Sequence, residues 1–156
     1  GIRLQRERRH AVYGDLAVRQ TWDRPVESDS IWRYFRIPLN FLEPGQAYDL
    51  YAAAMNPAGG RATLNAYVKV RRPGRPLGLR PLAPAPLQFG ASTCPREGHL
   101  RFRAPNEDSA FAGVFVALQP PSGVNSGSVV WDGLRVIPTP RPARAWPLLA
   151  TLLSPT

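Results

Sequence analysis

The chain has 156 residues, 44% of them apolar, and carries a formal net charge of +9 at pH 7. This length and apolar content suffice for one domain with a hydrophobic core, and they exclude a chain that is disordered throughout. No stretch of about 18 apolar residues is present, so no membrane-spanning helix is predicted. Residues 1–10 are too charged for a signal peptide.

The counts of proline, lysine and cysteine further constrain the fold and the environment of the chain. The 18 prolines, roughly twice the usual share, must lie in turns, edge strands and extended segments. Lys69 is the single lysine among 20 basic residues, a bias that either a GC-rich genome or a thermophilic host would produce. Cys94 is the single cysteine, so no internal disulfide can form and the fold does not require an oxidising compartment.

The first 40 residues are predicted to hold a basic arm and two strands. The arm is residues 1–10, with four arginines against one glutamate. Weak alternation of apolar and polar residues predicts a strand over Ala11–Arg19, and Thr21–Ser30 is a polar loop. Aromatic and β-branched residues predict a second strand over Ile31–Leu39, which ends near Pro38.

Leu42–Val70 is predicted to be one antiparallel hairpin around which the rest of the fold is arranged. A Pro-Gly turn opens it, and Gln46–Met55 is its first strand. Asn56–Gly60 is the turn, and Ala62–Val70 is the return strand. In the return strand, apolar residues at every second position alternate with Thr, Asn, Tyr and Lys. This period of two predicts one buried face and one face in water.

Residues 71–87 contain five prolines, two glycines, four arginines and no acid. The composition predicts an extended, polyproline-like loop, roughly 50 Å long if it were straight. Loops of this length inside a compact domain tend to be functional.

The remaining chain is predicted to hold three strands and a tail. Gly98–Ala104 alternates, and Ala110–Leu118 is apolar on both faces, which is typical of a central strand. Ser128–Ile137 is the last strand, with Gly133 at a β-bulge. The tail, residues 138–156, begins extended and ends in a short helix that starts near a proline.

Seven or eight short strands without a helix in the body predict an all-β fold, an antiparallel two-sheet jelly-roll sandwich. Its domain spans 11–137, with Pro/Arg-rich extensions at residues 1–10, 71–87 and 138–156. The first two segments carry charges of +3 and +4, residues 133–156 carry +3, and the rest of the chain sums to −1.

Basic appendages on a near-neutral body favour docking to an acidic partner. Nucleic acid is disfavoured because the arms lack interleaved aromatics and no DNA-binding motif occurs. A membrane surface is disfavoured because the C-terminal helix candidate has no basic face. We expect an acidic protein surface, with the apolar C-terminal end as an anchor. The predicted contact residues are Arg3, Arg6, Arg8, Arg9, Arg71, Arg72, Arg75, Arg80, Arg141, Arg144, Trp146, Leu149, Leu152 and Leu153.

Three stretches resemble the carbohydrate-binding-module type of jelly roll, also called galactose-binding-like: Ile31–Leu39, Leu42–Leu50 with its Pro-Gly followed by Tyr, and residues 129–136 with Trp-Asp. The resemblance covers roughly residues 20–138 and implies a binding domain without catalysis. It implies sugar stacking on exposed aromatics, and Asp132 matches an acid that helps to hold a structural calcium in that family, although its partner acids are not evident. The candidate aromatics are Trp22, Trp32, Tyr34, Tyr51 and Tyr67, for which packing in the core or on a sheet surface is the alternative.

Jelly rolls with arms also build virus particles, and the architecture resembles a bacteriophage head decoration (cement) protein, commonly a trimer. No metal-ligand cluster, phosphate loop or selected triad is present, so neither an enzyme nor a cofactor is predicted. The leading hypothesis is a virion protein on the capsid surface, a homotrimer bound to the major capsid protein or another acidic surface. The alternative is a carbohydrate-binding module, on a phage tail or secreted enzyme, with a glycan as its partner. The third hypothesis is a nucleic-acid-binding accessory protein.

Overall fold

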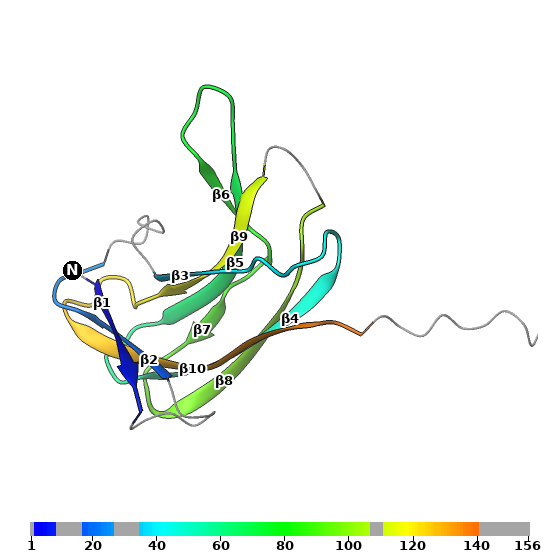
Figure 1. Ribbon diagram of the computed structural model, residues 1–156. Helices are drawn as coiled ribbons and strands as arrows, with labels where there is room; N and C mark the ends of the chain where they lie inside the picture. The colour runs from blue at the N-terminus through cyan, green and yellow to red at the C-terminus, as the bar shows by residue number, and fades with distance from the viewer. Residues whose placement is uncertain (1, 9–16, 27–34, 107–110, 141–156) are drawn as a thin grey trace, which may run out of the picture.

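The computed structural model describes residues 2–8, 17–26, 35–106 and 111–140. This part of the chain is built from β-strands, all paired antiparallel (Figure 1). The ten strands are β1 (Ile2–Glu7), β2 (Ala17–Trp22), β3 (Phe35–Pro38), β4 (Ala47–Asn56), β5 (Ala62–Val70), β6 (Gly78–Pro81), β7 (Leu87–Phe89), β8 (Ser92–Arg103), β9 (Phe111–Gln119) and β10 (Gly127–Pro138). No helix in these ranges is long and apolar enough to cross a membrane.

The strands form two sheets that enclose one core. Sheet A has the order β1-β2-β10-β4-β8. Sheet B has the order β3-β9-β5-β6, and β7 also pairs with β5. This arrangement confirms the predicted all-β, antiparallel two-sheet sandwich.

The predicted hairpin over Leu42–Val70 is wrong in its pairing, although its strands and turn are placed correctly. β4 pairs with β8 and β10 in sheet A, whereas β5 pairs with β9, β6 and β7 in sheet B. The turn between them, with Gly59 and Gly60 at positive φ, therefore carries the chain from one sheet to the other. Alternation shows that each strand has a buried face. It does not show whether two strands lie side by side or face each other across a core.

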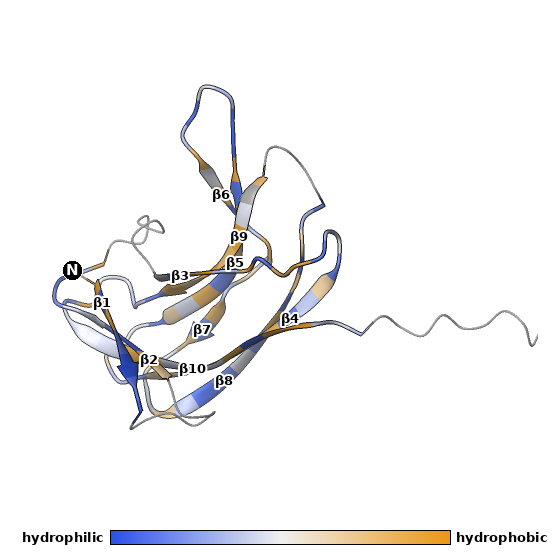
Figure 2. Ribbon diagram, viewed as in Figure 1, coloured by the Kyte–Doolittle hydropathy of each residue, from blue (hydrophilic) through white to orange (hydrophobic). Residues whose placement is uncertain are grey.

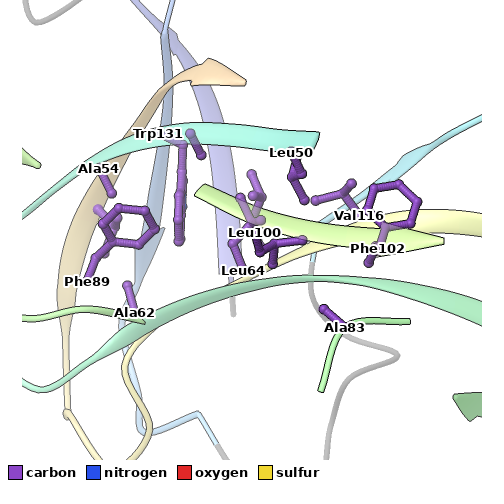
Figure 3. Close-up of a cluster of buried hydrophobic side chains, with 14 of the residues drawn as sticks. Leu50, Ala54, Ala62, Leu64, Ala83, Phe89, Leu100, Phe102, Val116 and Trp131 are labelled. Atoms are coloured by element: carbon purple, nitrogen blue, oxygen red, sulfur yellow. The ribbon is translucent and has the colours of Figure 1, made fainter. Parts of the chain in front are cut away.

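The core lies between the two sheets (Figure 3). Leu50 and Val129 enter it from sheet A, and Leu64, Val116 and Leu118 enter it from sheet B, each at most 2% exposed. Burying a side chain of this size contributes about 1.5–3 kcal/mol.

Buried Gln20 on β2 ties the two sheets together. Its Nε2 donates to the carbonyl oxygen of Leu118 on β9 (3.1 Å), and its Oε1 accepts from Nε1 of Trp131 on β10 (2.9 Å). Trp131 in turn packs edge-on against Phe89, with ring centroids 5.7 Å apart. β2 extends to Trp22, past the predicted strand end at residue 19, because Gln20 and Trp22 both pack inward.

The expected N-terminal arm is a strand in the described residues. β1 pairs with β2 over six residues, from Ile2 opposite Trp22 to Glu7 opposite Ala17. The side chain of Glu7 bonds Arg19 on β2, with an Nη2–Oε2 distance of 2.7 Å. The high charge suggested a free arm, but backbone pairing does not depend on side-chain charge, and charged residues are common on edge strands.

The predicted long loop over residues 71–87 is also shorter than expected. β6 returns along β5, and the amide of Leu82 donates to the carbonyl oxygen of Ala66 (2.8 Å). Pro81 lies at the end of this edge strand, where a missing N–H is tolerated. The turn that remains, residues 71–77, projects from the sandwich beyond β5 and β6 (Figure 1).

Several local predictions are confirmed. β9 lies between β3 and β5, as expected of a central strand. β8 directs Leu100 and Phe102 into the core and Arg101 and Arg103 outward. Gly133, at φ 59°, lies where the β10–β4 register shifts, which is the predicted bulge. The predicted C-terminal helix and residues 31–34 of the predicted second strand lie outside the described residues.

Candidate functional site

The outer face of sheet B holds two aromatic rings on neighbouring strands. Tyr67 on β5 lies opposite Phe115 on β9, and their rings stack with centroids 5.8 Å apart and an angle of 23° between planes. Tyr67 is 9% exposed and Phe115 is 3% exposed. The predicted wet face of β5 is therefore largely buried, because the two rings, Ala117 and Leu79 form a second small apolar cluster there.

Two cations lie over the Phe115 ring. The Cζ of Arg36 on β3 is 5.7 Å from the ring centroid, and the Nζ of Lys69 on β5 is 5.6 Å from it. The negative face of an aromatic ring attracts such cations. The ring thus has both a guanidinium and an ammonium over it, and both residues are half-buried. We call this group, Arg36, Tyr67, Lys69 and Phe115, the cationic face.

Hydrogen-bonding side chains lie beside the cationic face on the same two strands. Thr63 Oγ1 donates to Gln119 Oε1 (2.7 Å). Burial raises the pKa of Tyr67 above its ordinary value of 10.0, and a hydrogen bond with Gln119 partly opposes the rise. Tyr67 is therefore a neutral hydroxyl group at physiological pH.

The turn 71–77 continues the strand that carries Tyr67 and Lys69. Every residue of this turn is exposed, and its chain is mostly hydrophilic (Figure 2). Gly74 has φ 66°, and the amide of Arg75 donates to the carbonyl oxygen of Arg72 (3.1 Å), which closes the turn.

An open hollow of about 500 Å³ lies at the same end of the molecule. Its described lining includes Arg80 on β6, Arg103 on β8 and Phe111 on β9. Arg80 lies over the Phe111 ring, 5.2 Å from the centroid, and Arg103 donates to the carbonyl oxygen of Gly45 (2.6 Å).

The outer face of sheet A holds a different cluster, centred on buried Asp49 on β4. One carboxylate oxygen bonds Nε2 of His99 (2.8 Å) and accepts from Nε of Arg101 (2.9 Å). The other accepts from Oγ1 of Thr139 (2.9 Å). Led by the Arg101 hydrogen bond, these contacts lower the pKa of Asp49 from 3.8 to about 2 against the opposing effect of burial. Asp49 is ionised at neutral pH and joins three segments of sheet A.

Tyr51, two residues along β4, lies beside this cluster. Its ring stacks with that of His99 at 4.6 Å between centroids, and the Cζ of Arg135 lies 4.8 Å from its centroid. The ring is half-buried, with a cation and an imidazole as neighbours.

Comparisons with known proteins give matches among solved structures only. No family model and no curated protein matches the chain. The CBM22-2 xylan-binding domain from Paenibacillus barcinonensis Xyn10C matches with a TM-score of 0.63 and 12% identity over 88% of both chains. The tandem CBM22-1-CBM22-2 domain of the same protein matches with a TM-score of 0.67 and 11% identity, over 88% of this chain and 43% of that one.

A "Family 16 Carbohydrate Binding Module-2" matches with a TM-score of 0.59 and 13% identity, over 88% of this chain and 86% of that one. The fold is that of the carbohydrate-binding jelly rolls. This agrees with the resemblance indicated by the sequence. The matches concern the fold and carry no information on a phage capsid.

Within this jelly-roll fold, the predicted sugar-stacking aromatics have different positions. Trp22 is 4% exposed and points into the core, where its Nε1 donates to the carbonyl oxygen of Val124 (3.0 Å), so its prediction as a ligand aromatic is wrong. An aromatic at the end of a strand cannot be assigned to either face until its pairing is known. Tyr51 and Tyr67 lie on the outer faces of sheets A and B, and Trp32 and Tyr34 lie outside the described residues.

Sequence reasoning missed Phe115, Arg36 and Lys69 as neighbours of Tyr67. The alternating face of the apolar run in β9 was the available signal, since every second residue from Phe111 points away from the core. It also missed Phe41, which is 60% exposed in the turn after β3.

The predicted contact residues of the arms also have different positions. Arg3 and Arg6 lie on β1 and Arg8 follows it, all exposed. Arg71, Arg72 and Arg75 lie in the exposed turn, and Arg80 lies on β6. The rest lie outside the described residues: Arg9, Arg141, Arg144, Trp146, Leu149, Leu152 and Leu153.

Asp132, the calcium candidate, lies on β10 before the bulge and is 7% exposed. Its Oδ1 accepts from the backbone amide of Gly133 (2.6 Å). Among the described residues no group of three His, Cys, Asp or Glu side chains could hold a metal ion. These residues therefore do not fit a calcium site at Asp132.

Proposed function

We propose that this chain is a glycan-binding module without catalytic activity, and that the glycan binds on the outer face of sheet B. The observation that carries the proposal is the Tyr67–Phe115 pair with Arg36 and Lys69 on a sheet face that points away from the core. Aromatic rings with convergent polar groups form the usual kind of small-ligand site. The likeness of the fold to carbohydrate-binding modules supports the assignment.

The outer face of sheet A is the competing surface. Its central carboxylate, Asp49, already bonds His99, Arg101 and Thr139. Those bonds hold β4, β8 and the end of β10 together, so the carboxylate is engaged in a structural role. This favours sheet B as the ligand surface.

Isothermal titration calorimetry of the full chain against soluble neutral and acidic polysaccharides tests the proposal, with xylan and polygalacturonate as first probes. Tyr67→Ala is expected to weaken the affinity at least tenfold. Tyr51→Ala is the matched control, since it removes a half-buried tyrosine from the opposite outer face, and it should change the affinity less than twofold. Thermal unfolding of both variants checks that they are folded.

Two outcomes contradict the proposal. If Tyr51→Ala abolishes binding and Tyr67→Ala does not, the ligand surface is sheet A. If the unmodified chain binds neither neutral nor acidic polysaccharide, the module does not bind glycans of these classes.

The capsid-decoration hypothesis stays a prediction. In that hypothesis, basic arms reach neighbouring subunits. Residues 2–7 lie in a sheet of their own domain, and residues 141–156 lie outside the described ranges. A trimer, a capsid partner and a virion location therefore depend on the C-terminal segment and the 71–77 turn.

A further inference from the structure

The basic residues of sheet B are not accompanied by acids in its strands. Its strands, together with the chain that joins β5, β6 and β7, contain six basic residues and no aspartate or glutamate. The six are Arg36, Lys69, Arg71, Arg72, Arg75 and Arg80. The strands of sheet A, in contrast, combine seven arginines with four acids: Glu7, Asp49, Glu97 and Asp132. A field of one sign over one sheet attracts a ligand of the opposite charge.

The cations of the turn 71–77 are held on an ordered backbone. Pro73 fixes one φ of the turn and Gly74 supplies the positive φ that follows it, as in a type II turn. The arginines on either side, Arg72 and Arg75, are joined by the backbone hydrogen bond that closes the turn. Among the described residues no carboxylate forms an ion pair with Arg71, Arg72 or Arg75. These guanidinium groups are thus available to an external acceptor.

Lys69 connects this turn to the cationic face. Its ammonium lies over Phe115 while its backbone belongs to the last part of β5, two residues before Arg71. Covering Lys69 with a neutral polymer would remove water from its ammonium group without supplying a counter-charge, which is unfavourable. A carboxylate supplies that charge, and the planar guanidinium group matches its two oxygens.

We propose that the glycan bound by this chain is acidic, a polysaccharide that carries carboxylates of the uronic-acid type. Its backbone lies along the outer face of sheet B, and its carboxylates meet Lys69 and the arginines of the turn 71–77. This inference rests on the glycan-binding function proposed above. The likeness of the fold to carbohydrate-binding modules favours a glycan over nucleic acid, and duplex DNA is tested as the alternative polyanion.

Two matched pairs of polymers separate charge from sugar identity. The first is polygalacturonate and its methyl ester, and the second is glucuronoxylan and its carboxyl-reduced form. Calorimetry of the full chain should give an affinity at least tenfold higher for the charged member of at least one pair. Because the contacts are exposed, this affinity should fall as salt is raised from 50 to 500 mM.

Charge-matched variants locate the contact. Arg71→Gln/Arg72→Gln/Arg75→Gln and Arg3→Gln/Arg6→Gln/Arg8→Gln both lower the net charge by three, and all six side chains are exposed. The turn variant should bind the charged polymer at least tenfold more weakly, and the β1 variant less than threefold more weakly. Lys69→Met should weaken binding of the charged polymer more than that of its neutral counterpart. Thermal unfolding confirms that each variant is folded.

The outcomes are separable. If the neutral member of each pair binds as tightly as the charged one, the acidic-glycan inference is overturned and the glycan-binding function stands. Equal losses in the two triple variants overturn it too, since binding would then follow net charge alone. Absence of binding to all four polymers overturns both proposals. Tighter binding of duplex DNA, with the same dependence on the turn, would assign the surface to nucleic acid instead.

Discussion

Asp49 illustrates how a single residue stabilises one sheet by joining segments that are distant in sequence. It lies at a position that alternates outward on β4, yet its side chain is only 6% exposed. Arg101 and His99 come from β8 and Thr139 from the end of β10, so its carboxylate connects three neighbouring segments. A buried carboxylate with such partners is stabilised in its ionised form.

The acid stability of the chain should therefore depend on Asp49. Its pKa of about 2 in the folded chain lies below the ordinary 3.8, so its contribution is complete above pH 4 and is lost as the pH falls towards 2. The loss should be on the order of 1–2 kcal/mol, because water screens the exposed Arg101. Urea unfolding from pH 6 to pH 2 measures it.

Asp49→Asn should remove most of this pH dependence and destabilise the chain at pH 7 by about 1–3 kcal/mol. Glu97→Gln on β8 is the control, because Glu97 is exposed and should leave the acid profile unchanged. Parallel pH profiles for the unmodified chain and Asp49→Asn would contradict the assignment.

Gln20 joins the two sheets to each other, as Asp49 joins segments within sheet A. Gln20→Leu leaves Nε1 of Trp131 and the carbonyl oxygen of Leu118 without this partner inside the core. We expect the free energy of unfolding to fall by about 2–4 kcal/mol. The same substitution at exposed Gln5 on β1 should change it by less than about 0.5 kcal/mol. A comparable small change at Gln20, measured by urea unfolding, would show that the bridge is not stabilising.

At the scale of elements, β1 and β6 show how composition misleads. Both lie in segments that were predicted to be an unpaired arm or loop, because those segments are rich in charge or proline. Both form edge strands, where a charged outer surface is common and a missing N–H can face water. The local sequence does not show whether a neighbouring strand offers free hydrogen-bonding groups.

Removing residues 1–8 tests whether this segment is a strand or an arm. Deletion should lower the free energy of unfolding by about 1–3 kcal/mol, since it removes the ladder with β2, the packing of Ile2 and the Glu7–Arg19 ion pair. Arg3→Gln/Arg6→Gln/Arg8→Gln keeps the strand and should leave stability nearly unchanged. Equal thermal midpoints for the deletion variant and the intact chain would favour a free arm instead.

For the molecule as a whole, the main asymmetry is that the strands of sheet B contain basic residues and no acids, whereas those of sheet A contain both. Apolar surface, in contrast, is dispersed. The exposed large apolar side chains in the described ranges are Leu4, Phe41, Leu77 and Ile137. They lie on four separate elements, so they do not form the contiguous patch that a stable interface requires.

Light scattering of the full chain therefore should give a mass near 17.2 kDa, that of one chain. Three times that mass would favour the trimer predicted from the sequence. In that case, light scattering of a chain that ends at residue 140 would show whether the C-terminal segment is responsible. Loss of the trimer on this truncation would assign the trimer contacts to residues 141–156.

The sequence by itself determined β4, β5, β9 and β10, the turn between β4 and β5, the bulge at Gly133 and the excess of positive charge. Alternation, glycine and proline act over a few residues, so these features can be read locally. Tertiary structure decided that β4 and β5 belong to different sheets, that Trp22 points into the core and that Asp49 meets Arg101. It also brought Arg36, Lys69 and Phe115 to Tyr67, which was the only member of the cationic face named from the sequence. Pairing depends on hydrogen bonds and packing between segments dozens of residues apart, and no local pattern specifies which segments those are.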